Sequence, residues 1–395
     1  MLNLKKVEQG LFFLTLLFLP TQLGRHFWPQ FSFVYSLPID YLSPTLYFWD
    51  ILVLCLWVVF LISGKHISRL ALIFFYFFIL TQAISLVFNT DASGVGLIRL
   101  EQYTIAGLFG VYIASSKFKI QNSKFSLPLS MALLGESVLA IMQFLKGGSL
   151  GFWILGERAF SLSTPAIAKF DFYGREFLRP YGTFPHPNVL AAFMLISLML
   201  LPIRRWSLVL GGLTILLTVS RVALIAGFAL VMFIFKKNRK LVILFVLFLL
   251  PVLYTRYASI FNFDNLTFLR REQLSLTAFT LWTKHPLFGV GLNNFIPSAA
   301  DFLLSGPNRF LQPVHNIFLL SLSETGLIGL VGLISLIGYP IIKLVKFQIS
   351  NFKFQILTIW ATIIFLGMFD HYFLTLPQGY RLLFLVWGLS MAVLE

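Results

Sequence analysis

Residues 313–332 read PVHNIFLLSLSETGLIGLVG, in which proline, histidine and asparagine precede a long apolar run. The run predicts a membrane helix, and it places the ionisable imidazole of His315 where this helix leaves the water. The first turn of a helix has unpaired N–H groups and the positive end of the helix dipole, so anions are favoured there. The glycines Gly326, Gly329 and Gly332 fall roughly along one helix face and leave room for another backbone to approach. The stretch suits chemistry on a charged lipid, but it is also typical of an interfacial histidine packed against a loop.

The composition extends the membrane interpretation to the whole chain. Of its 395 residues 58% are hydrophobic and 11% are charged, and 45 are phenylalanine. A soluble domain could not bury so much apolar surface, and the alternating pattern of a transmembrane β-barrel is missing, so we predict an all-α polytopic membrane protein. The single cysteine, Cys55, excludes an intramolecular disulfide and a cysteine-based metal site. The net charge of +15 is spread over many loops, so we predict no nucleic-acid partner.

The apolar runs predict about twelve transmembrane helices in a single membrane domain over residues 1–395. These spans are 8–24, 46–63, 70–88, 100–115, 126–145, 188–203, 206–219, 222–235, 241–255, 316–340, 354–369 and 380–394. Basic clusters fall on one side of this arrangement, at Lys5/Lys6, Lys65/Arg69, Lys117/Lys119/Lys124, Arg204/Arg205, 236–240 and Lys343/Lys346/Lys353. By the positive-inside rule this side is cytoplasmic and holds both termini. No small-residue cleavage site follows the first run, so we expect an uncleaved helix there.

Two long loops, 146–187 and 256–315, are predicted on the exoplasmic side, and both carry many basic residues. Spans seven and eight are short, at about 14 residues or about 21 Å of helix, whereas the hydrocarbon core is about 30 Å thick. We therefore expect the turn Val219-Ser220-Arg221 to lie sunk in the outer leaflet, where an arginine needs an anionic partner or a wet cavity. Basic groups at this place would suit a phosphate-bearing lipid. The alternatives are that Arg221 snorkels to the surface and that the basic loops are an ordinary solvated face.

Two further features place polar groups close to the membrane. Residues 268–283 predict an amphipathic helix lying on the membrane surface, and residues 285–291 after it predict a turn-rich re-entry segment. The apolar side of the predicted helix would hold Leu269, Leu276, Phe279 and Trp282, with Arg270, Arg271 and Gln273 partly on the other side. Glu136 lies within the fifth span and needs a polar partner or water, which the sequence does not identify.

The stretch from Arg179 to Asn188 reads RPYGTFPHPN and leads into the sixth span. Asn188 is well placed to cap the helix that follows. Pro185 and Pro187 fix the backbone on either side of His186, which either lines a site or is only held in the loop. Arg179 lies upstream, where it is able to fold over the membrane surface.

Four blocks of sequence resemble the O-antigen ligase family, which includes O-antigen polymerases and protein O-oligosaccharyltransferases. They are Arg179 to Asn188, Ser220-Arg221 at the top of a short span, Trp282 to Phe295 with PLFGVGLNNF, and His315-Asn316 followed by Gly326 and Gly329. The fourth block is similar to the ligase signature of a histidine, a small polar residue and two glycines at fixed spacing. Asp370-His371-Tyr372 resembles a block in a subset of the family, and the likeness covers about residues 95 to 395. Leu330 stands where many ligases have a small hydroxyl residue, which leaves the choice between ligase and polymerase open.

The resemblance implies a GT-C-like membrane glycosyltransferase that is inverting and metal-independent. Such an enzyme takes a glycan from undecaprenyl pyrophosphate on the exoplasmic face, and the ligase passes it to a hydroxyl of the lipid A-core. We expect His315 to accept the proton of the acceptor hydroxyl or to orient the acceptor, because an imidazole has a suitable pKa. Arg179 and Arg221 would hold the pyrophosphate by bidentate contacts. No two exoplasmic carboxylates have Asp-x-Asp spacing, so we expect neither a metal nor a cofactor.

Other residues are candidates for supporting roles. Asn316 either caps its helix, which we favour, or positions His315, and Asp370 and His371 either orient a site group or form an interfacial pair. The expected partners are the lipid-linked glycan donor, a lipid A-core, glycan or protein acceptor, and membrane lipids. The expected location is the bacterial inner membrane, with the site facing the periplasm.

Proteins of two other classes fit parts of the same pattern. A lipid-linked glycan flippase would have a similar number of spans, but it should show matching halves and charge buried in a central cavity. The sequence shows neither feature. A scaffold subunit of an envelope-assembly complex, without catalysis, stays open, as do polymerase and protein transferase within the family.

Overall fold

The computed structural model describes residues 4–89, 93–116, 123–172, 174–202, 205–234, 240, 243, 265–300, 302, 311–346 and 351–394. The predicted span 241–255, most of the basic run 236–240 and parts of the second long loop lie outside these residues. The chain forms two compact units. The first comprises Met1–Leu19, Leu23–Leu129 and Arg271–Glu395, and the second comprises Pro20–Gln22 and Ser130–Arg270. The single membrane domain stays a prediction.

Helices make up most of the described chain and lie where the apolar runs predict them. The first unit contains α1 (Leu4–Leu17), α2 (Phe48–Ile62), α3 (Arg69–Phe88), α4 (Ser93–Ser116), α11 (Phe295–Ala299), α12 (Ile317–Lys346), α13 (Asn351–Phe369), α14 (Tyr372–Thr375) and α15 (Pro377–Leu394). The second contains α6 (Pro187–Leu200), α7 (Arg205–Thr218) and α8 (Arg221–Ile234), while α5 (Ser123–Lys146) and α10 (Asn265–Lys284) have residues in both units. Each predicted span within the described residues corresponds to one of these helices, although α1 begins and ends earlier than expected.

Within the described residues, four helices are long and apolar enough to cross a membrane. They are α3, the part of α5 from Phe125 to Lys146, α12 and α13. Helices α7 and α8 have 14 residues each, as expected for the two short helices on either side of the turn before Arg221. These findings confirm a mostly helical, polytopic membrane protein, whereas the number of twelve spans stays a prediction.

Helix α12 is broken at Gly326, whose φ of 65° and ψ of −163° are not helical. The segment 286–291 lies against the break. The backbone N–H of Leu327 donates to the Pro286 carbonyl at 2.9 Å, and that of Gly291 donates to the Glu324 carbonyl at 2.8 Å. A Cβ at residue 326 would collide with the Leu287 carbonyl, so only glycine allows this approach. The expected close approach of another backbone is therefore present, but the prediction of one continuous face through all three glycines is wrong.

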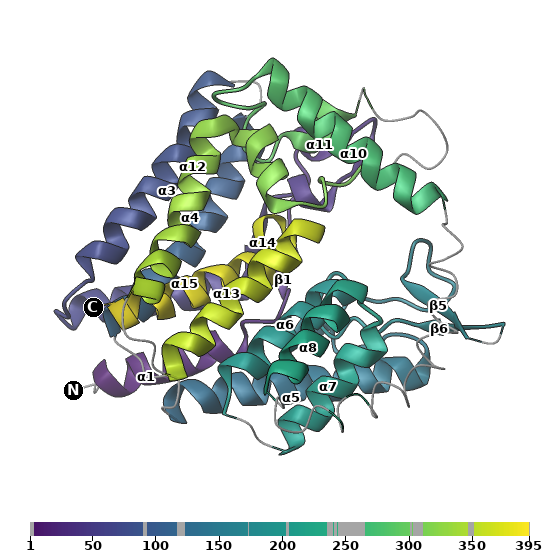
Figure 1. Ribbon diagram of the computed structural model, residues 1–395, viewed down its shortest axis with the longest axis horizontal. Helices are drawn as coiled ribbons and strands as arrows, with labels where there is room; N and C mark the ends of the chain where they lie inside the picture. The colour runs from purple at the N-terminus through teal and green to yellow at the C-terminus, as the bar shows by residue number, and fades with distance from the viewer. Residues whose placement is uncertain are drawn as a thin grey trace. The chain divides into compact units, whose positions relative to one another are not determined.

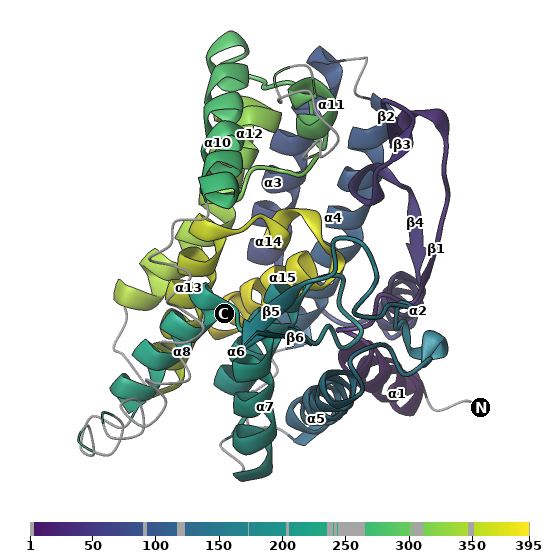
Figure 2. The ribbon, with the colours of Figure 1, turned by 90° about the vertical axis from the view of Figure 1, so that its right-hand side faces the viewer.

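The helices of the first unit pack closely where glycines remove side chains. Figure 1 shows α3, α4 and α12 running side by side, and α15 packs against α4. A Cβ at Gly388 of α15 would meet the carbonyl of Gly110 in α4, and one at Gly332 of α12 would meet Thr81 of α3. Figure 2 shows two short antiparallel ribbons on the α4 side of this unit, β1 (Gly24–His26) with β4 (Thr45–Tyr47) and β2 (Phe33–Val34) with β3 (Leu37–Pro38).

Helix α10 lies at the predicted amphipathic segment 268–283 and has two apolar faces rather than one. Leu274, Ala278 and Leu281 are buried. Leu276 and Phe279, from the predicted apolar side, are exposed by 62% and 53%. The predicted side is therefore the one left open to a membrane surface, because the other face already packs against protein.

The second unit packs α6, α7 and α8 together and carries a hairpin of β5 (Lys169–Phe172) and β6 (Arg175–Leu178). The rings of Phe170 and Phe177 on this hairpin stack on Phe144 of α5, with ring centroids 6.3 and 6.0 Å apart. The first long loop is therefore anchored to α5, and this hairpin was not predicted from the sequence.

Candidate active site

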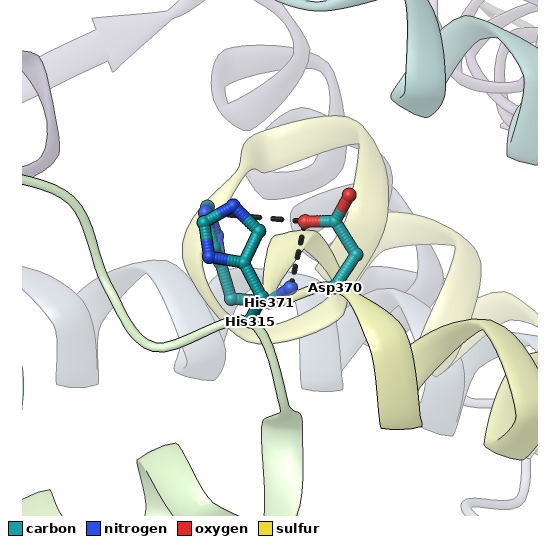
Figure 3. Close-up of side chains that lie close together, drawn as sticks. All are labelled: His315, Asp370 and His371. Carbon is teal, nitrogen blue, oxygen red and sulfur yellow. Dashed lines mark hydrogen bonds and ion pairs between the residues drawn. The ribbon is translucent and has the colours of Figure 1, made fainter. Parts of the chain in front are cut away.

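The structure brings His315, Asp370 and His371 together in the first unit. His315 lies in the segment just before α12, whereas Asp370 and His371 lie between α13 and α14. The two imidazole rings have centroids 5.1 Å apart and are inclined by 73°. The backbone N–H of His371 donates to Asp370 Oδ1 at 2.8 Å, and His371 Nε2 lies 3.9 Å from the same oxygen. Figure 3 shows the two rings and the carboxylate gathered at one point, with His315 arriving on the green loop.

Asn316 fixes the backbone beside His315. Its Oδ1 accepts hydrogen bonds from the backbone N–H groups of Phe318 and Leu319 at 2.9 and 3.0 Å, so it caps α12. Its Nδ2 donates to the carbonyl of Met368 at the end of α13, at 3.2 Å. The cap, which was the favoured role for Asn316, is therefore present, and the same side chain joins the two helix ends that carry the site.

His371 is held on two sides. Its Nδ1 lies 2.6 Å from the hydroxyl oxygen of Thr375, and the ring of Tyr41 packs edge-on against it at 5.5 Å between centroids. The side chain is buried. His371 therefore has a fixed ring orientation, and its Nε2 is directed toward the Asp370 carboxylate rather than toward Thr375.

Arg99 of α4 supports these contacts and was missed by the sequence reasoning. Its guanidinium is buried, and it donates to the Thr375 carbonyl at 2.8 Å and to the Tyr41 carbonyl at 3.4 Å. It also donates to Asn293 Oδ1 at 3.0 Å. Arg99 thus reaches both residues that contact His371. The available signal was an arginine at the edge of an apolar span, which is costly unless it has partners.

The surroundings of His315 favour its neutral form. Burial lowers the pKa of this imidazole, the Asp370 carboxylate acts to raise it, and the Arg271 guanidinium lowers it. The net direction of the pKa is below the ordinary value for histidine, which favours the neutral imidazole at pH 7. A nearby carboxylate also stabilises the imidazolium that forms when the ring takes a proton. This combination fits a general base.

The same three side chains form a group of possible metal ligands. One ligand atom each from His315, Asp370 and His371 lie within 4.8 Å of one another. Two imidazoles and a carboxylate are a donor set that zinc and other first-row ions accept. The expectation of a metal-independent reaction therefore stays a prediction, and a chelator experiment addresses it directly.

Arg179 joins two predicted motifs within the second unit. Its Nε donates to the carbonyl of Thr218, the last residue of α7, at 2.6 Å, and its Nη2 donates to Asn188 Oδ1 at 2.7 Å. Thr218 is followed by Val219, whose φ of 49° makes a sharp turn, and α8 then begins at Arg221. The structure therefore places Arg179 directly against the turn that precedes Arg221, and the Arg221 side chain is exposed.

The cap of α6 differs from the prediction. Helix α6 begins at Pro187, and its N-cap is His186, whose Nδ1 accepts a hydrogen bond from the backbone N–H of Asn188 at 3.1 Å. The prediction of Asn188 as the N-cap is wrong, because proline fits the first helical position and moves the N-cap two residues earlier, to His186. The Asn188 side chain is used by Arg179 instead.

Two polar residues of α5 form hydrogen bonds to the stretch between Arg179 and His186. Glu136 accepts hydrogen bonds from the Thr183 hydroxyl at 2.6 Å and from the Thr183 backbone N–H at 2.9 Å, which identifies the partner that the sequence did not. Gln143 Oε1 accepts from the backbone N–H groups of Tyr181 and Gly182 at 3.0 and 2.7 Å. The backbone of residues 181–183, between Arg179 and His186, is therefore fixed by buried hydrogen bonds.

These features define a helical membrane protein with a histidine–aspartate cluster at the start of a long apolar helix. The family model for O-antigen ligase matches residues 206–334, so this part of the chain is similar to that family. The predicted resemblance to the O-antigen ligase family is confirmed. The match includes Ser220-Arg221, the block 282–295 and His315 to Gly329, whereas the blocks at 179–188 and 370–372 lie outside it. No curated protein matches the chain.

The similarity of residues 206–334 to this family indicates a bacterial membrane protein with glycosyltransferase activity of the ligase or polymerase type. A lipid-linked glycan donor and a glycan or lipid acceptor follow in general terms.

Proposed function

We propose that this chain transfers a glycan from undecaprenyl pyrophosphate to an acceptor hydroxyl on the exoplasmic face of the bacterial inner membrane. The first candidate is O-antigen ligase, with the lipid A-core as acceptor, and both termini would be cytoplasmic. The observation that carries the proposal is the close approach of His315 to Asp370 and His371, with His315 inside the region matched by the O-antigen ligase family.

His315 takes the proton of the acceptor hydroxyl in this reaction. The hydroxyl oxygen then attacks the anomeric carbon of the donor sugar, and the bond from that carbon to the pyrophosphate oxygen breaks. Attack opposite the leaving group inverts the anomeric configuration. Asp370 stabilises the imidazolium of His315 as it forms, and His371 is fixed beside both groups.

Arg179 and Arg221 neutralise the leaving pyrophosphate. In the second unit Arg179 contacts two neutral acceptors, the Thr218 carbonyl and the Asn188 amide oxygen. A phosphate oxygen is a stronger acceptor for a guanidinium than either of these, because both partners are charged. Arg179 therefore has a fixed position near the turn before Arg221 and could exchange these neutral acceptors for the donor phosphate.

The test is glycan transfer by the purified full chain from a purified lipid-linked donor. The His315→Ala variant should lose activity by about 100-fold or more, since a general base contributes about 10²–10⁴-fold. The matched control is His26→Ala, which removes an exposed histidine on β1. Full activity of His315→Ala would eliminate the base role.

The same assay tests the metal question and the rival classes. Activity should persist after chelator treatment, and a loss that is restored by added divalent metal would overturn the arginine-only scheme. A flippase would move the donor across vesicles without forming a transferred product, and a scaffold would do neither. Offering lipid A-core, free glycan and peptide acceptors in parallel, with product analysis, separates ligase, polymerase and protein transferase.

A further inference from the structure

A large cavity opens at the end of the first unit that holds the N-terminus. Its volume is about 730 Å³, and it lies among the first turns of α1, the segment after α2, the end of α4 and residue Leu127 of α5. Both chain termini lie toward this end of the unit in Figure 1. The cavity shares no lining residue with the candidate active site.

Basic side chains outnumber acidic ones in the lining of the cavity. Lys5, Lys65 and His66 line it, and all three are exposed. Among its described lining residues Glu8 is the one acid, and Glu8 is buried. Its two carboxylate oxygens accept from Lys65 Nζ at 2.8 and 2.6 Å, and the Tyr112 hydroxyl donates to the first of them at 3.0 Å. The single negative charge is thus already satisfied, which leaves Lys5 and His66 to receive an anion.

One wall of the same cavity is apolar. Phe12, Phe13 and Leu127 line it, and the Leu127 side chain is 46% exposed. A small inorganic anion gains nothing from an apolar wall, whereas an acyl chain is stabilised by contact with it. Basic pockets between membrane helices at the cytoplasmic surface are typical binding places for anionic lipid headgroups.

We propose that this cavity binds an acidic phospholipid from the membrane leaflet on the N-terminal side of the chain. Lys5 and His66 donate hydrogen bonds to the phosphate oxygens of the headgroup. The Glu8–Lys65 pair lies beneath the headgroup. Phe12, Phe13 and Leu127 contact the upper part of an acyl chain. The proposal is independent of glycan transfer, because its residues lie apart from the candidate active site.

The experiment is native mass spectrometry of the purified full chain titrated with phosphatidylglycerol or with phosphatidylcholine of the same acyl chains. The test variant is Lys5→Gln/His66→Gln, which leaves the pair of exposed Lys65 and buried Glu8 intact and so should fold. The control variant is Lys343→Gln/Lys346→Gln, which removes two basic residues of α12 that do not line the cavity.

We expect phosphatidylglycerol to bind more tightly than phosphatidylcholine, with an affinity at least about fivefold lower in the test variant, since one cation near a lipid surface contributes about that factor. The control variant should bind like the wild type. Equal affinity for the two lipids, or an equal loss in both variants, would overturn the proposal. Displacement of the lipid by millimolar inorganic phosphate would also overturn it, in favour of a free-anion site.

Discussion

At the scale of single residues, the chemistry depends on how the surroundings of His315 set its charge. Burial disfavours the imidazolium and Asp370 favours it, and the net pKa lies below the ordinary value. The neutral imidazole is thus favoured before the reaction, and the Asp370 carboxylate stabilises the imidazolium that forms when the ring takes a proton. His315 and the Asp370–His371 pair come from separate segments, so their meeting is a property of the fold and not of either motif alone.

The pH dependence of transfer should follow from this balance. The rate should fall as the pH drops through the lowered pKa of His315, because protonation removes the base. Asp370→Asn removes the group that raises the pKa of His315, so the acidic limb of the profile should move to lower pH. On the plateau kcat should fall about tenfold for each pKa unit by which the imidazolium is less stabilised. The measurement is a kcat/KM and kcat profile against pH. Asp171→Asn, an exposed carboxylate on β5, is the control, and a limb that moved to higher pH would contradict the assignment.

Arg99 should act on the reaction through His371. Arg99→Gln leaves the Thr375 carbonyl without its buried donor, at a cost of about 1–3 kcal/mol in stability, while the Tyr41 carbonyl keeps the Asn293 amide as donor. Thr375, whose hydroxyl contacts His371, is then less firmly positioned, so kcat should fall more than KM rises. Arg99→Lys keeps the charge but cannot bridge both carbonyls, and it should recover stability better than kcat. Steady-state kinetics and the thermal midpoint are measured together, and an unchanged kcat with a lowered midpoint would show a merely structural role.

At the scale of elements, the sequence predicts those features that depend on neighbours along the chain. Helix positions follow from apolar runs, and the cap by Asn316 follows from the residues beside it. The break at Gly326 does not, because it depends on residues 286–291 packing against α12. The partner of Glu136 and the role of Arg99 are missed for the same reason, since Thr183 and Thr375 are distant in the sequence. The two-residue error in the N-cap of α6 arises because Pro187 occupies the first helical position and makes His186 the cap.

The break in α12 predicts that residue 326 must be glycine. Gly326→Ala must hold a side chain at φ 65° and ψ −163°, a region that essentially only glycine adopts, which costs about 1–3 kcal/mol, and its Cβ would collide with the Leu287 carbonyl. We expect a thermal midpoint several degrees lower in detergent, with loss of transfer, because the displaced segment leads to Asn293. The control is Gly135→Ala in α5, where an added Cβ meets nothing within 4 Å and alanine is the better helix former. Equal stability of wild type and Gly326→Ala would show that the break is not required.

At the scale of the whole molecule, the candidate residues divide between the two compact units. His315, Asp370 and His371 belong to the first unit, while Arg179 and Arg221 belong to the second. The proposed reaction requires one lipid-linked donor to meet the base and both arginines. It therefore predicts that the turn before Arg221 and the start of α12 come close together in the membrane.

Cysteine cross-linking tests this prediction. In a Cys55→Ser background, which removes the single native cysteine, Val222→Cys places a thiol next to Arg221 and Gln312→Cys places one three residues before His315, without replacing either residue. A short bis-maleimide should join the pair in membranes, and bound donor should change the yield. The control pairs Val222→Cys with Lys346→Cys, because Lys346 lies at the other end of α12, about 45 Å of helix away. If only the control pair were joined, or if neither pair were, Arg179 and Arg221 would lose their assigned role in binding the donor pyrophosphate. The role of His315 as base is tested separately, by the His315→Ala variant.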